Sequence, residues 1–393
     1  MDRLCKNCVL IIIDTVGGIM DTTKKIKVIE FVGQLADGGA ETLVVNYAKL
    51  LNPQIFEVSV LTIYPNCNTA NAKRLEKASI PVISVFKKHN IISKCVWHIC
   101  GKKYMDYRLR HIIKSYQPDV IHIHLENLKY LVPISDDLHG IKLFFTCHSL
   151  PTQMLSGKNV DEGKAAKYLI DNAGMRMIAL HEDMRKEINN MFDIQNTTII
   201  RNGVDKRAFV ALKETCQEIR KSLGINPDCY LVGHVGRFTD VKNHAFLLDV
   251  FKCIVEEKDN SHLLLVGTGE TEQSIRQKVK NLGLEQNVSI YSHRTDIPRL
   301  LKALDVFVFP SLYEGLSVTL VEAQTAGVRC VISENINIEN VLSSNTIQLS
   351  LDKPAAEWAR VALDETIKTE VYGNIENYDM NREIINLEKL YLE

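Results

Sequence analysis

The segment 310–323 contains two glutamates, Glu314 and Glu322, whose carboxylates could bind the hydroxyl groups of a sugar. Glu314 follows the apolar run Val306–Phe309, which places it in the loop at the carboxyl end of a strand. Glu322 falls two turns into the next helix, whose apolar residues indicate burial, and an unpaired buried carboxylate is costly. We therefore favour binding roles over the alternatives, a turn residue and an exposed helix residue. The amides that begin this helix could bind a diphosphate or the attached sugar, and they belong to Gly315, Leu316 and Ser317.

Other positions in the second half could bind phosphates and a nucleobase. Arg237 and Lys242 stand five residues apart in a turn that follows a strand, and each could bind one phosphate. The alternative is a pair of solvated surface cations. Gly267 lies in a Gly-Thr-Gly turn, a weak signal because tight turns after strands need glycine in any case. Arg294 belongs to the segment 292–296, whose backbone could contact a nucleobase.

Three histidines in the first half lie along or after apolar strands. His122 and His124 alternate on one strand, so they share a face of the sheet. A metal pair there is conceivable, but we favour a structural role. His148 stands at the end of the next strand.

Strands and helices alternate along the chain and would position these groups. The strands are apolar nearly throughout, which predicts parallel sheets that are buried on both faces. The predicted strands are 27–32, 57–63, 80–85, 119–124, 142–148, 176–180, 197–201, 230–235, 262–266, 288–291, 306–309 and 329–332. The predicted helices include 40–51, 107–116, 243–257, 272–282, 297–303, 317–326, 355–369 and 381–392.

This alternation over 350 residues predicts an α/β protein with two Rossmann-like, doubly wound domains. Ligands of such folds bind at the carboxyl ends of the strands, here facing a central cleft. We expect an N-terminal domain at 21–204, a C-terminal domain at 205–372 and a final helical segment at 373–393. Residues 1–20 should be a disordered tail with no role of its own, and Met20 could be the true start. A signal peptide, or a zinc site at Cys5 and Cys8, is disfavoured.

Composition excludes several classes of protein. The 393 residues are 46% hydrophobic and 24% charged, with a net charge of −1, which argues against a disordered chain and a globally basic nucleic-acid binder. Apolar runs fall short of the roughly 18 residues of a membrane span. Ten cysteines scattered through apolar segments indicate reduced thiols in a cytosolic protein.

Residues 73–114 carry eleven basic and two acidic side chains, with apolar residues and Trp97 between them. A basic face with apolar anchors suits an anionic membrane surface. A solvated helical face is the alternative, and nucleic acid is a poorer one because no binding motif accompanies the charge.

Glu314 and Glu322 have the E-x7-E spacing typical of retaining glycosyltransferases of family 4, which have the GT-B fold. The chain resembles that family over about residues 25–392, and in particular its enzymes of bacterial capsule and exopolysaccharide assembly. Supporting segments are 38–42, 119–124, 146–149 and 201–205, together with the Arg237/Lys242 pair. Ser317 departs from the family, which often has proline or phenylalanine there, and leaves the donor sugar open.

The resemblance implies roles for these residues. Arg237 and Lys242 would neutralise the diphosphate of a nucleotide-sugar, over which the Gly38-Gly39 loop would close. Glu322 would hold the ribose and Glu314 the donor sugar. His148 would lie near the donor sugar and the acceptor; its alternative is a hydrogen-bonded histidine at a strand end.

The resemblance also implies retention of anomeric configuration, and a front-side mechanism fits better than a covalent intermediate. The chain has no Asp-x-Asp motif, so we expect no metal and no other cofactor, with cations and helix dipoles stabilising the leaving diphosphate. The expected donor is a UDP-sugar, and the expected acceptor is a polyprenyl-linked saccharide or another glycan. We expect a cytoplasmic enzyme, and a further hypothesis places it peripherally on the inner face of the plasma membrane. A nucleotide-sugar 2-epimerase and a non-catalytic nucleotide-sugar-binding subunit remain as alternatives.

Overall fold

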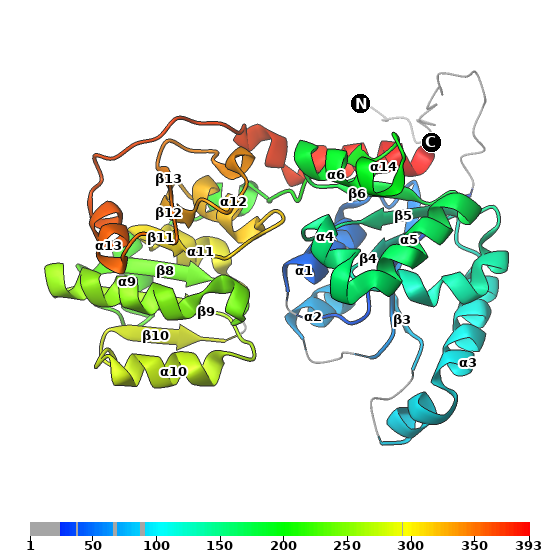
Figure 1. The fold of residues 1–393 in the computed structure, drawn as a ribbon, viewed down its shortest axis with the longest axis horizontal. Helices are drawn as coiled ribbons and strands as arrows, with labels where there is room; N and C mark the ends of the chain where they lie inside the picture. The colour runs from blue at the N-terminus through cyan, green and yellow to red at the C-terminus, as the bar shows by residue number, and fades with distance from the viewer. Residues whose placement is uncertain (1–23, 37, 66–68, 87–90, 293) are drawn as a thin grey trace, which may run out of the picture.

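A computed structural model describes residues 24–36, 38–65, 69–86, 91–292 and 294–393, apart from the side chains of 91–100. The predicted tail 1–20, with Cys5, Cys8 and Met20, lies outside these residues. Two lobes stand side by side, and each holds a parallel sheet with helices packed around it (Figure 1). In the described part of the chain no helix is long and apolar enough to cross a membrane.

The first lobe holds a seven-stranded sheet in the order β3-β2-β1-β4-β5-β6-β7, and every pairing is parallel. Because β1 lies between β2 and β4, the winding reverses beside it. The strands are β1 (Ile26–Phe31), β2 (Phe56–Thr62), β3 (Val82–Ser84), β4 (Val120–His124), β5 (Lys142–Thr146), β6 (Arg176–Ala179) and β7 (Thr198–Ile199). The helices are α1 (Gly39–Leu50), α2 (Ala70–Lys77), α3 (Ile91–Tyr116), α4 (Pro151–Met154), α5 (Val160–Ala173) and α6 (Glu182–Phe192).

The second lobe holds a six-stranded parallel sheet in the order β10-β9-β8-β11-β12-β13. Its strands are β8 (Tyr230–Val235), β9 (Ser261–Val266), β10 (Val288–Tyr291), β11 (Val306–Phe309), β12 (Arg329–Ser333) and β13 (Thr346–Leu349). The helices that follow the first lobe are α7 (Arg207–Val210), α8 (Cys216–Ser222), α9 (His244–Glu257), α10 (Glu272–Asn281), α11 (Ile297–Lys302), α12 (Val318–Thr325), α13 (Ala355–Leu363) and α14 (Met380–Leu392). Two doubly wound parallel sheets were predicted, and that prediction is confirmed.

Burial on both faces explains the apolar character of the strands. In β1, Ile29 and Phe31 join one apolar cluster, whereas Val28 joins another that contains α1 and α14 residues. All three side chains are fully buried. Since alternate residues of a strand point to opposite faces, a strand covered on both sides must be apolar at successive positions.

Several predicted boundaries differ from the structure, and one strand was missed. The helix predicted over 107–116 begins at Ile91, and the strand predicted over 142–148 ends at Thr146. The helix predicted over 355–369 ends at Leu363, because the Asp364 carboxylate accepts hydrogen bonds from the backbone and hydroxyl of Thr366 and so forms a turn. The strand β13 was not predicted. The strand has only 4 residues, and its polar residues form side-chain hydrogen bonds that the sequence does not reveal. One example runs from Thr346 Oγ1 to Gln324 Oε1 at 2.8 Å.

The last helix, α14, packs on the first lobe although it follows the second in sequence (Figure 1). Its residues Ile384, Leu387 and Leu390 share an apolar cluster with residues of α1 and β1. Tyr391 is fully buried there. The helix therefore places a polar hydroxyl inside the first lobe.

Candidate active site

Lys242 and Glu314 meet at the carboxyl ends of β8 and β11. Lys242 closes a short 3-10 turn (Asp240–Lys242), and its Nζ lies 2.6 Å from Glu314 Oε1. The two side chains are only 17% and 13% exposed. The ammonium group also lies 4.6 Å from the centroid of the Phe309 ring, a cation–π distance. The fold thus brings a cation and a carboxylate, predicted separately, into one ion pair.

Arg237 points elsewhere than Lys242. Its side chain is 69% exposed, and its ion pair within the described residues is a loose one with Glu270, at 3.7 Å. Gly267 supports this turn, because a Cβ there would lie 1.9 Å from the Gly236 carbonyl oxygen, and its φ of +156° disfavours other residues. Of the two predicted phosphate ligands, then, Lys242 is held by the protein and Arg237 extends into solvent.

Gly315 lies at one of the contacts between the two lobes. A Cβ at this position would lie 2.9 Å from the carbonyl oxygen of His148 and 3.1 Å from Cα of Ser149. Leu316, the next residue, is buried, and its carbonyl oxygen lies 3.5 Å from Asn202 Nδ2. The glycine is therefore required for the close approach of the loop after β11 to the end of β5.

Ser317 caps helix α12. Its hydroxyl accepts a hydrogen bond from the backbone N–H of Leu320, and the residue is 6% exposed. A serine at this position has a local explanation, since N-cap serines satisfy an orphan donor of the first turn. Helix α12 begins at Val318, directly after the loop that contains Glu314.

Glu322 lies in α12, close enough to the first lobe for the charge of Arg74 to act on it. Burial raises the pKa of its carboxyl to about 7, and the charge of Arg74 acts against that rise. Arg74 comes from α2 and donates hydrogen bonds to Asn71 and Asn46. Among the described residues, the Glu322 carboxylate has no hydrogen-bond partner. In the sequence Arg74 stands out only as part of the basic segment 73–114, and no local pattern indicates that it lies opposite Glu322.

His148 joins the site to the interior of the first lobe. Its Nε2 lies 2.9 Å from Nδ1 of His124, whereas its own Nδ1 is shielded from solvent and has no partner in the described part of the protein. Desolvation, with the neighbouring His124 as a smaller cause, holds the pKa of His148 well below its ordinary value. The imidazole is therefore neutral and presents one ring nitrogen without a hydrogen bond.

His122 and His124 lie side by side, with ring centroids 4.0 Å apart, beside Glu30 of β1. One ligand atom from each of these three residues falls within 4.8 Å of the others, close enough to hold a metal ion. Each of those atoms already has a hydrogen-bond partner: Tyr391 for His122 and Glu30 for His124. A structural role for the two histidines was favoured over a metal pair from the sequence, and it stays a prediction.

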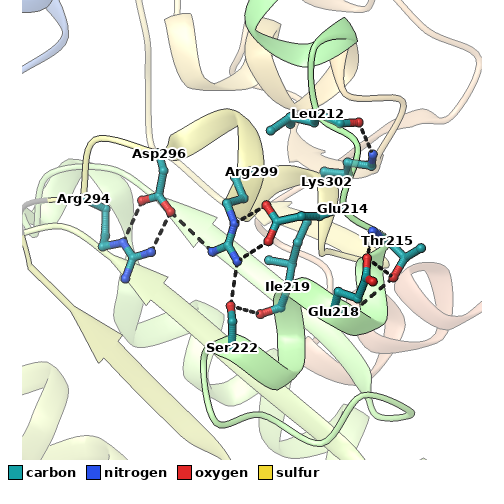
Figure 2. Close-up of polar contacts among 10 residues, drawn as sticks. All are labelled: Leu212, Glu214, Thr215, Glu218, Ile219, Ser222, Arg294, Asp296, Arg299 and Lys302. Atoms are coloured by element: carbon teal, nitrogen blue, oxygen red, sulfur yellow. Dashed lines mark hydrogen bonds and ion pairs between the residues drawn. The ribbon is translucent and has the colours of Figure 1, made fainter.

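The remaining predicted residues are Gly38, Gly39 and Arg294. Gly38 is the N-cap of α1, and a Cβ on Gly39 would meet nothing within 4 Å. The guanidinium of Arg294 is held by Asp296 at 2.6 and 2.8 Å. Figure 2 shows that Asp296 also faces Arg299, which pairs with Glu214. The Arg294 side chain thus belongs to an ion-pair network, and only its backbone corresponds to the predicted base contact.

Two family models match the chain, one for each lobe. Residues 37–207 match the model described as Glycosyltransferase Family 4, and residues 216–382 match Glycosyl transferases group 1. EpsF of Bacillus subtilis (strain 168) is 27% identical over 354 residues, which cover 86% of this chain and 87% of EpsF. The UDP-Gal:alpha-D-GlcNAc-diphosphoundecaprenol alpha-1,3-galactosyltransferase of Escherichia coli is 30% identical over 241 residues, 60% of this chain and 62% of that enzyme.

Solved structures share the fold along nearly the whole chain. The crystal structure of Anabaena Alr3699/HepE in complex with UDP and glucose matches with a TM-score of 0.74 at 18% identity, covering 93% of this chain and 99% of that one. The architecture is GT-B, as the sequence predicted.

Proposed function

Because this chain is a glycosyltransferase of the GT-B fold, with a family 4 domain followed by a group 1 domain, we propose that it transfers a hexose from a UDP-sugar to a lipid-linked saccharide or another glycan. Its place is in the synthesis of polysaccharides or related glycans. The proposal includes retention of anomeric configuration and a product that belongs to a capsule or exopolysaccharide.

The observation that carries the proposal is the Lys242–Glu314 pair beside the interlobe contact at Gly315. A cation held beside the loop that leads into α12 is suited to a diphosphate, because the ammonium and the N-terminus of a helix both favour negative charge. Glu314, one residue from that contact, suits the hydroxyl groups of the attached sugar. The neighbour solved with UDP and with UDP-glucose supports a UDP-sugar as donor.

The chain's own residues then divide the work of the reaction. Lys242 and Arg237 neutralise the charge that develops on the leaving diphosphate, and the amides of Gly315, Leu316 and Ser317 add their dipoles. Glu322 accepts hydrogen bonds from the ribose. Gly38 and Gly39 approach the diphosphate from the first lobe. In this proposal the reaction needs no metal ion and no other cofactor.

Thermal shift and product analysis test the proposal together. UDP, GDP, ADP and common UDP-sugars are screened with and without Mg²⁺, on wild type and on Lys242→Ala and Glu322→Ala variants. Stabilisation by UDP compounds without Mg²⁺, lost in both variants, is expected. Lys252→Ala is the matched control, since Lys252 lies on α9 and, within the described residues, pairs with Glu256 of the same helix.

Product analysis separates the proposed activity from its rivals. The expected result is release of UDP that depends on added glycan acceptor. A new nucleotide-sugar formed without acceptor would instead identify an epimerase, and binding without any turnover would identify a non-catalytic subunit.

We also propose that the basic segment 73–114 contacts an anionic membrane at its cytoplasmic face. In the described part of this segment, Arg110 and Lys114 pair with Asp137, and Arg108 donates to the Val85 carbonyl oxygen. These contacts leave other lysines of the segment for lipid phosphates, among them Lys102 and Lys103, both exposed. Flotation with phosphatidylglycerol vesicles at low salt is expected to carry the protein upward. Absence of binding there, or equal binding to neutral phosphatidylcholine vesicles, would contradict the contact.

A further inference from the structure

A chain of three hydrogen-bonded side chains leads from the interior of the first lobe to the interlobe contact; Glu30 and His124 are fully buried and His148 is half-buried. Glu30 of β1 is fully buried, and its Oε2 lies 2.7 Å from Nε2 of His124. The other ring nitrogen of His124 lies 2.9 Å from Nε2 of His148. We name these three residues, Glu30, His124 and His148, the Glu30 triad. It ends at Nδ1 of His148, which has no partner among the described residues.

The direction of each hydrogen bond in the Glu30 triad follows from the state of Glu30. An ionised carboxylate only accepts, so His124 must donate from Nε2. A neutral imidazole has a single N–H, which leaves Nδ1 of His124 bare and able only to accept from His148. His148 then carries its hydrogen on Nε2, and its Nδ1 is an acceptor.

We propose that Glu30, acting through His124, holds His148 in the tautomer whose unprotonated Nδ1 accepts a hydrogen bond from a sugar hydroxyl. Glu30 and His124 are positioning residues in this scheme, and His148 is the group that touches substrate. The inference rests on the proposed function only for the identity of the hydroxyl. The principle is that of a carboxylate that orients a histidine, here with a second histidine between the two.

The surroundings of Glu30 agree with this assignment. The titratable groups that face it are His122 and His124 of β4, Tyr391 of α14 and Tyr47 of α1. Tyr391 donates to Glu30 Oε1 at 3.0 Å, so both carboxylate oxygens accept. Its hydroxyl oxygen can then accept from His122 Nδ1, at 2.6 Å, and His122 Nε2 accepts from Thr146. The donors of His122, His124, Thr146 and Tyr391 thereby find acceptors, whereas the buried Tyr47 hydroxyl has no hydrogen-bond partner among the described residues.

The ionisation of these groups sets the condition for a clear measurement. Burial raises the pKa of Glu30 to about 8, against the opposing hydrogen bond from Tyr391. Burial lowers the pKa of His124 to about 3. With a pKa of about 8, the Glu30 carboxyl is mostly protonated at pH 7 and mostly ionised at pH 9, where the imidazoles are neutral. The proposed tautomer is the one set by ionised Glu30, so it is measured at pH 9.

Nitrogen NMR of protein labelled with [15N]histidine reads the tautomer directly, because bare and protonated ring nitrogens have well-separated shifts. At pH 9 the wild type is expected to show His148 with bare Nδ1 and protonated Nε2. A proton on Nδ1 would overturn the proposal, and this result needs no variant and no substrate. A change of the His148 nitrogen signals when zinc is added or removed would also overturn the proposal, because it would show that the cluster binds a metal ion.

Two variants test the route of the effect. Glu30→Met removes the obligate acceptor, so His124 shifts its hydrogen to Nδ1 and His148 gains a proton on its own Nδ1. Thr146→Val is the matched control: it alters the same buried cluster, through His122, without touching the Glu30 triad. Equal His148 spectra of a folded Glu30→Met variant and wild type would overturn the proposal.

The substrate contact is tested with UDP-glucose, UDP-galactose and UDP-N-acetylglucosamine, each against UDP as the reference. At least one bound UDP-sugar is expected to move the His148 Nδ1 signal further than UDP does. Binding of a UDP-sugar without that additional shift would overturn the hydroxyl contact. If none of the three binds, the proposed function fails, while the tautomer at pH 9 still decides on the Glu30 triad.

Discussion

Replacing Glu314 by glutamine should tighten the binding of UDP while it weakens sugar transfer. Nζ of Lys242 lies 2.6 Å from the Glu314 carboxylate, so a diphosphate that binds Lys242 competes with that carboxylate. Glutamine keeps the shape of the side chain but removes the charge. UDP then meets a cation that no longer has an anionic partner inside the protein.

The size of the effect follows from the burial of the pair. Exposed ion pairs contribute about 0–1 kcal/mol, and because these side chains are only 17% and 13% exposed, we expect this pair to contribute at the upper end of that range. Competition worth about 1 kcal/mol corresponds to a roughly fivefold lower Kd for UDP. The transfer rate should fall by about tenfold or more, because a hydrogen bond from the sugar to a charged group is lost.

Isothermal titration calorimetry with UDP at pH 7 and low salt measures the gain. Glu270→Gln is the matched control, because Glu270 makes only the loose, exposed pair with Arg237, and its UDP affinity should stay within twofold of wild type. Weaker or unchanged UDP binding by a folded Glu314→Gln variant would refute the reasoning. It would mean that Glu314 supports Lys242 in the complex and does not compete for it.

Three further predictions concern the same region. Gly315→Ala should lower transfer activity by tenfold or more with little loss of UDP binding, since its methyl group would push against the His148 carbonyl. Initial rates measure the transfer activity and calorimetry measures UDP binding. A near wild-type rate would contradict the contact. Gly267→Ala should destabilise the second lobe by about 3 kcal/mol, because its Cβ would overlap the Gly236 carbonyl oxygen; urea unfolding measures this, with Gly224→Ala, where φ is also positive but the space is open, as the comparison. The pKa of Glu322, raised from 4.5 to about 7, means that the fold favours its protonated form. Wild type should therefore lose about 1–2 kcal/mol of stability relative to Glu322→Gln as pH rises from 4.5 through 7, once partial exposure is allowed for; parallel stability curves across that range would contradict the shift.

The sequence by itself determined the fold class and the positions of most strands. Runs such as Val306–Phe309 are too apolar for one covered face, so a parallel sheet with helices on both sides was the consistent interpretation. Local patterns also placed Glu314, Gly315 and Lys242 at the carboxyl ends of strands, because a strand, a glycine turn and a helix start are all short-range signals. The end of α13 and the strand β13 were not predicted, because they depend on side-chain hydrogen bonds of Asp364, Thr346 and Gln324. Such bonds leave no periodic pattern in the sequence.

Tertiary structure alone decided which of these residues meet. Lys242 and Glu314 are 72 residues apart, and only the adjacency of β8 and β11 makes them an ion pair. Tyr391 reaches Glu30 across 361 residues because α14 returns to the first lobe. The apolar sequence of β1 does not show which residue will form a hydrogen bond with Glu30. The free energy of burying it is acceptable only once other elements supply the hydrogen bonds, and that is a property of the assembled fold.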